Sequence, residues 1–64
     1  SPASDVLHVR ATTTGRLEIV DLQGRVVIRS MVAGSVVRIP IGDVAPGLYS
    51  LNVEGAAPVR VVVQ

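Results

Sequence analysis

Apolar and polar residues alternate with a period of two along much of this chain. Leu7 and Val9 flank His8, and the same alternation recurs in residues 16–20, whose sequence is RLEIV. Successive side chains of a β-strand point to opposite faces, so this spacing is typical of strands with one buried face. No helix of useful length is indicated. The pattern predicts six short strands, over residues 5–10, 16–20, 25–31, 35–41, 48–54 and 59–63.

Residues of the turn-forming types separate these strands. Asp21 and Gly24 suit the first and fourth positions of a type I turn, in which the Asp carboxylate accepts backbone N–H groups two residues on. Residues 16–31 are therefore expected to form a hairpin, and residues 55–58 to close a second one. Pro40 cannot donate to a sheet hydrogen bond and belongs on an edge or at a strand end. The remaining connections are expected to be loops over residues 11–15 and 32–34 and a corner over residues 42–47. This organisation predicts an all-β fold, an antiparallel sandwich of two sheets.

Composition favours one small module without catalytic chemistry. The chain has 64 residues, of which 14 are Val, and it lacks Phe, Trp, Cys and Lys. A single domain over residues 1–64 is expected, with 1–4 as the end of a linker. The absence of Cys excludes a disulfide framework and a thiolate zinc site. The six Arg residues are scattered and the net charge is only +1, so no nucleic-acid partner is expected.

Few residues are candidates for chemistry. His8 is the only histidine and is expected on a solvent-facing side of its strand, away from any orienting acid. Asp21, Asp43 and Glu54 could meet at one end of a sandwich and hold calcium, although the two Asp residues are more typical of turns. We therefore expect no enzyme, no cofactor and no metal.

The segment over residues 43–53 indicates a corner. Pro46 and Gly47 lie just before Tyr49, which opens an alternating strand. In immunoglobulin-like sandwiches a Tyr at this position packs its ring into the core and donates its hydroxyl to nearby backbone. Tyr49 is the only aromatic residue and is expected to be the largest single contributor to the core. This corner favours a small immunoglobulin-like antiparallel β-sandwich of six to seven strands.

Four stretches, in this order, resemble the type A C-terminal sorting domain of cargo proteins of the type IX secretion system of Bacteroidetes. They are SPASDVLHV (1–9), LEIVDLQGRVV (17–27), VAPGLYSLNV (44–53) and VRVVVQ (59–64). The resemblance spans the whole chain. It implies an address signal that directs an attached N-terminal cargo across the outer membrane.

The resemblance implies several partners. They are an outer-membrane translocon, a shuttle protein and a sortase, which removes the domain by cutting upstream of or near Ser1. It also implies passage through the periplasm to the cell surface or the medium. The precursor is then expected to end at Gln64. A non-catalytic accessory or spacer module at the end of a secreted multidomain enzyme remains the alternative.

Recognition is expected to use surface and edges, because the chain offers no pocket chemistry. The last strand either completes the core alone or also presents an edge to a partner strand, and both interpretations stay open. Arg25 either pairs with an acid or contacts a receptor. The same edge could also pair two copies of the chain. The recognition candidates are Val59, Arg60, Val61, Val62, Val63, Gln64 and Arg25, and the residues assigned to maintaining the fold are Asp21, Gly24, Pro46, Gly47 and Tyr49.

Overall fold

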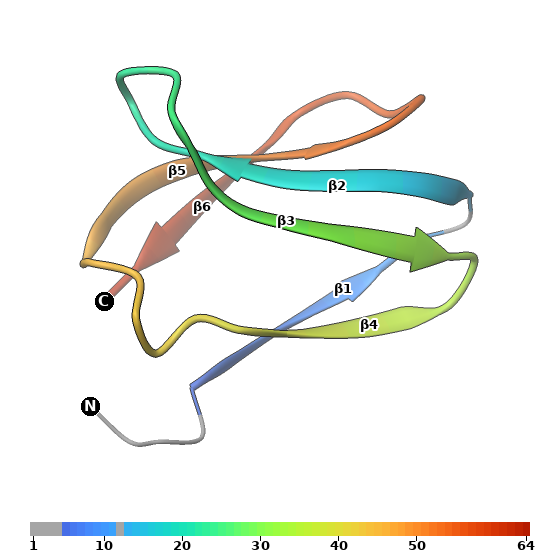
Figure 1. Ribbon diagram of the computed structural model, residues 1–64, viewed down its shortest axis with the longest axis horizontal. Helices are drawn as coiled ribbons and strands as arrows, with labels where there is room; N and C mark the ends of the chain where they lie inside the picture. The colour runs from blue at the N-terminus through green and yellow to red at the C-terminus, as the bar shows by residue number, and fades with distance from the viewer. Residues whose placement is uncertain (1–4, 12) are drawn as a thin grey trace.

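A computed structural model describes residues 5–11 and 13–64 and contains six strands in two antiparallel sheets (Figure 1). The expected all-β sandwich is confirmed. The strands are β1 (Val6–Arg10), β2 (Thr14–Val20), β3 (Val26–Ala33), β4 (Val36–Pro40), β5 (Gly47–Val53) and β6 (Val59–Val63).

The larger sheet has the order β3-β2-β5-β6. The β2–β3 hairpin is confirmed, with a register shift between Ile19 and Val20 where the Asp21 turn begins. β5 pairs with β2 on one side and with β6 on the other. The strand β6 is therefore at one edge of this sheet and β3 is at the other, as Figure 1 shows.

The smaller sheet pairs β1 with β4. The tight connection between β3 and β4 joins the two sheets, because the chain leaves the larger sheet at Ala33 and enters the smaller one at Val36. Pro40 is the last residue of β4, as expected from its missing N–H. In the part of the chain that the structure describes, no helix is long and apolar enough to cross a membrane.

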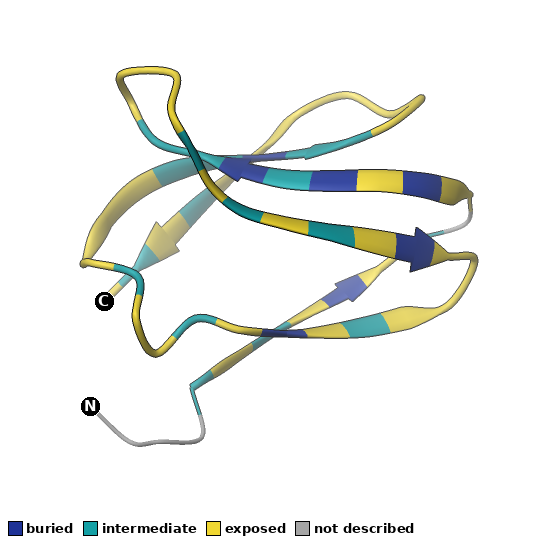
Figure 2. Cartoon of the chain, viewed as in Figure 1, coloured by how far each residue is buried: buried dark blue, intermediate teal, exposed yellow. Residues whose placement is uncertain are grey.

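The core lies between the sheets and is built by five of the six strands. Its buried side chains are Val9, Leu17, Ile19, Val32, Ile39 and Leu51. Burying each such side chain stabilises the fold by roughly 1.5–3 kcal/mol. Figure 2 shows the buried segments on β1 to β5, whereas β6 has only intermediate and exposed residues.

Two of the expected loops were partly wrong. Thr14 and Gly15 belong to β2, and Val32 and Ala33 belong to β3. Thr12 lies outside the described residues. Gly15 and Val32 are register partners, and both are buried, so each extends the hairpin by pairing with the other.

Candidate recognition surface

The strand β6 presents an edge. Its five residues pair with β5, from Leu51↔Val59 to Gly47↔Val63, and no described strand pairs with its other side. Val61 packs against the core from a half-buried position. Val59 and Val62, by contrast, are 55% and 60% exposed. One strand therefore supports the core and also leaves backbone donors and acceptors at a sheet edge.

The turn after β2 is held by Asp21, as expected. The Oδ1 atom of Asp21 accepts the backbone N–H groups of Gln23 and Arg25, each at 2.9 Å, and the Asp21 carbonyl accepts the Gly24 N–H at 3.0 Å. Gly24 has φ +86°, a conformation that residues with a Cβ rarely adopt. The fold-maintaining role assigned to this pair agrees with these contacts.

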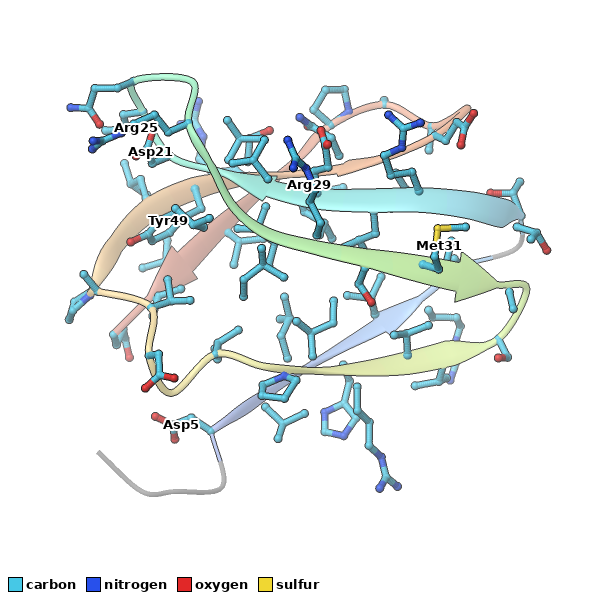
Figure 3. The ribbon with its side chains drawn as sticks, in the orientation of Figure 1. Asp5, Asp21, Arg25, Arg29, Met31 and Tyr49 are labelled. Carbon is cyan, nitrogen blue, oxygen red and sulfur yellow. The ribbon has the colours of Figure 1, made fainter. Side chains whose placement is uncertain are left out.

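Arg25 pairs with an acid, which was one of its two expected roles. Its Nε donates to Asp21 Oδ2 at 3.1 Å, and Figure 3 shows the two side chains together at the turn. The Arg25 backbone N–H, followed by this guanidinium and the Gln23 N–H, holds the pKa of Asp21 below its usual value. The Arg25 side chain is still 76% exposed, so the pairing leaves most of this side chain accessible.

The corner before β5 is closed by Tyr49. Its hydroxyl donates to the Ala45 carbonyl, four residues upstream, which confirms the expected corner. Gly47 has φ +155°, a conformation that favours glycine. The ring of Tyr49 packs against the core from a half-buried position, because the hydroxyl must reach backbone at the sandwich margin, and the fully buried side chains are aliphatic.

A groove of about 350 Å³ joins the Asp21 turn to β6. Asp21, Tyr49, Val59 and Arg60 all line it, although they are distant in the sequence. β5 brings them together, because Ser50 pairs with Val20 on one side and with Arg60 on the other. Leu22 and Leu48 line the same groove and are 77% and 42% exposed, but neither was among the recognition residues expected from the sequence. The only signal for Leu22 was an apolar side chain in a turn, and the only signal for Leu48 was an apolar side chain at an outward position of a strand.

The outer face of the larger sheet also carries polar side chains away from this groove. Arg29 Nε on β3 donates to Glu18 Oε2 on β2 at 3.3 Å. Met31, also on β3, is 63% exposed on the same face, and Figure 3 shows it at the far end of that strand. Exposed apolar side chains therefore occur at both edges of this sheet, and the groove described above joins the β6 edge to the Asp21 turn.

The other chemical candidates do not form a site. His8 is exposed on β1 opposite Arg38 of β4. No group of three His, Asp or Glu side chains in the described ranges could hold a metal ion, so the calcium site considered for Asp21, Asp43 and Glu54 is not assembled. Glu54 instead accepts the Arg16 backbone N–H through Oε1 at 3.0 Å.

One family comparison covers nearly the whole chain. A family model described as a secretion system C-terminal sorting domain matches residues 1–63. No curated protein and no solved structure matches the chain.

Proposed function

The chain belongs to the family of secretion system C-terminal sorting domains, and on this premise we propose that the β6 edge and its groove are the surface that the secretion machinery reads. Membership assigns the domain to type IX secretion, as a sorting signal for export across the outer membrane. It also implies an attached N-terminal cargo and contact with the secretion machinery. The proposal adds where that contact is made.

The observation that carries the proposal is the position of β6. It is the one strand of the six without a buried residue, and it lies at a sheet edge beside a groove. An extended segment of a partner could add to this edge through main-chain hydrogen bonds, while Leu22, Leu48 and Arg60 give side-chain specificity.

Further steps follow from the resemblance described above. The cargo passes through the periplasm, a shuttle protein and the translocon engage the folded domain, and a sortase then cuts upstream of or near Ser1.

A transport assay tests the function. Residues 1–64 are fused behind a periplasm-targeted fluorescent reporter, in a host with an active type IX system and in its transport-null mutant. We expect reporter on the surface or in the medium only in the active host, and with a mass that lacks the domain. Reporter that stays in the periplasm of the active host would contradict the proposal and favour the spacer alternative.

Matched variants test the surface without removing a strand. Val62→Lys changes an exposed residue of β6, and Met31→Lys changes an equally exposed residue of the opposite edge strand, β3. We expect export to fall with Val62→Lys and to persist with Met31→Lys, while both proteins keep the wild-type melting temperature. Equal export by the two variants would place recognition elsewhere on the domain.

A further inference from the structure

On the inner face of the larger sheet, the apolar side chains are buried or half-buried on β5 but become exposed at the start of β6. Leu51 of β5 and Val59 of β6 are register partners, so their side chains point to the same face. Leu51 is 8% exposed, but Val59 is 55% exposed. An apolar groove of about 260 Å³ lies beside them, lined by Val9, Val53 and Ala56 among others. An apolar cavity of about 150 Å³ can hold a benzene ring, so this groove has room for at least one further aliphatic side chain.

The edge of β6 also has few of the features that block pairing between proteins. Sheet edges are commonly protected by Lys, by Pro within the strand, by bulges or by inward-pointing charges. The β5–β6 pairing continues without a register shift, and Pro58 precedes the strand rather than interrupting it. Val59, Val61 and Val63 share the inner face, and the single charge, Arg60, is on the outer face with Val62.

We propose that a second copy of this chain occupies this edge, with the two β6 strands antiparallel about a twofold axis. The two four-stranded sheets then form one continuous sheet, in the order β3-β2-β5-β6 followed by the same strands reversed. The inference does not depend on the proposed sorting function. It bears on that function, because a paired β6 edge is not free to take a strand from the secretion machinery.

The sequence of β6 selects one register. Pairing Val61 with Val61 of the second copy aligns all five residues, so that Val59 lies opposite Val63 and Arg60 lies opposite Val62. A shift by one residue in each copy toward the start of the strand would set Arg60 against Arg60, and like charges in direct opposition are destabilising. The same shift would bring Pro58, which has no N–H to donate, into the ladder.

A shift in the other direction fails for a different reason. Pairing Val62 with Val62 of the second copy aligns only three of the five residues of each β6, because the strand ends at Val63, and it sets Arg60 against Gln64. In the favoured register, Val63 of the second copy lies beside Val59, at the uncovered end of β6. Valine side chains then continue the apolar inner face across the twofold axis, and neither Arg60 opposes a cation.

The pairing is expected to be weak. Five residues of one strand from each copy make a contact below the roughly 1,200 Å² at which stable interfaces begin. We therefore expect monomer at low concentration and an increasing share of dimer as the concentration rises. Sedimentation equilibrium on purified residues 1–64 measures this directly, and a molecular mass that stays monomeric at every concentration would overturn the proposal.

Charge variants of Val62 test the contact with Arg60 of the second copy. Val62→Lys sets two Lys–Arg pairs across the axis and Val62→Glu sets two Glu–Arg pairs. The dimer Kd should rise roughly two- to thirtyfold with Lys and fall by a similar factor with Glu. If Val62 contributed only apolar surface to the contact, both variants would dimerise more weakly than wild type, and that result would contradict the proposed register. Met31→Lys is the control on the opposite edge and should leave the dimer Kd unchanged.

Single cysteines test the register, because the wild-type chain has no Cys. Directly opposed residues of antiparallel strands have Cα atoms about 4.5–5.5 Å apart, within the range of a disulfide. Val61→Cys should therefore form a disulfide-linked dimer faster than Val62→Cys, although residue 62 is the more exposed. A mixture of Arg60→Cys and Val62→Cys should link more readily than Val62→Cys alone. Fastest linkage by Val62→Cys alone, or by Arg60→Cys alone, would overturn this register.

Discussion

Glu54 lies over the backbone of Gly15. A Cβ at residue 15 would come within 2.8 Å of Glu54 Oε1 and 3.1 Å of Glu54 Cβ. The same carboxylate accepts the Arg16 N–H at 3.0 Å, and the Glu54 N–H donates to the Arg16 carbonyl at 2.9 Å. The first turn of chain after β5 is thereby fixed to the start of β2, and the missing side chain of Gly15 provides the space.

This relationship predicts a sign reversal in a double-mutant cycle. Gly15→Ala should destabilise the domain by about 1 kcal/mol, because Glu54 must move and lose a hydrogen bond. In a Glu54→Gly background, which removes the Cβ of residue 54 together with the carboxylate, the same Gly15→Ala change should be neutral or slightly stabilising, because Ala suits a strand better than Gly. Urea unfolding of the four proteins measures both values. Equal changes in the free energy of unfolding in the two backgrounds would show that the close approach of Glu54 to Gly15 does not affect stability.

The Tyr49 corner predicts a moderate effect of losing one hydroxyl. Tyr49→Phe removes the hydrogen bond to the Ala45 carbonyl and keeps the ring against the core. The free energy of unfolding should fall by about 0.5–1.5 kcal/mol. Tyr49→Leu should cost more, because it also removes ring contacts. Thermal unfolding followed by circular dichroism measures the difference, and a Phe variant as stable as wild type would mean that water replaces the bond without loss.

The lowered pKa of Asp21 predicts that the stability of the domain depends on pH. The pKa of Asp21 is lower in the folded protein than in the unfolded chain, chiefly because of the Arg25 N–H hydrogen bond. The ionised Asp21 therefore stabilises the fold above its unfolded pKa, and this contribution is lost as the pH falls through the lower folded pKa. Asp21→Asn keeps an acceptor for the turn but cannot ionise. The melting temperature of wild type should exceed that of Asp21→Asn at neutral pH, and the difference should narrow in acid. A difference that is constant with pH would contradict the assigned interactions.

Two glycines predict opposite responses to the same substitution. Gly24 has φ +86° and open space around it, so Gly24→Ala should cost about 1 kcal/mol through backbone strain alone. Gly42 also has open space but no positive φ, so Gly42→Ala should be neutral or stabilising by up to about 1 kcal/mol. Chemical denaturation of both variants provides the comparison. Gly24→Asn should recover part of the loss, since Asn tolerates this conformation better than Ala. Equal responses at the two positions would exclude strain as the cause.

Local features of this protein could be predicted from its sequence. The alternation of residues 16–20 reports which face of β2 is buried, and the Asp21 and Tyr49 turns are closed by bonds to residues at most four positions away. Such signals are local, because side-chain direction in a strand and turn chemistry depend on near neighbours. The strands, the two hairpins and the corner were therefore predictable.

The ends of the hairpin were not predictable, because each depends on the other strand. Gly15 follows a run of Thr residues and Val32 lies two residues before Gly34, and both positions were therefore expected in loops. They are buried register partners in the structure, with Val32 1% exposed. Neither Gly15 nor Val32 can be recognised as a strand residue from its own sequence context, because each belongs to a strand only through pairing with the other.

The sequence alone determined the β fold, its turns and the resemblance to a sorting domain. Only the tertiary structure decided that β6 lies at an edge, that Arg60 and Asp21 line one groove, and that Leu51 is covered while Val59 is not. The reason is that the alternation of apolar and polar residues is a property of one strand. Whether a strand lies at an edge, lines a groove or has buried side chains depends on which other strands lie beside it and opposite it.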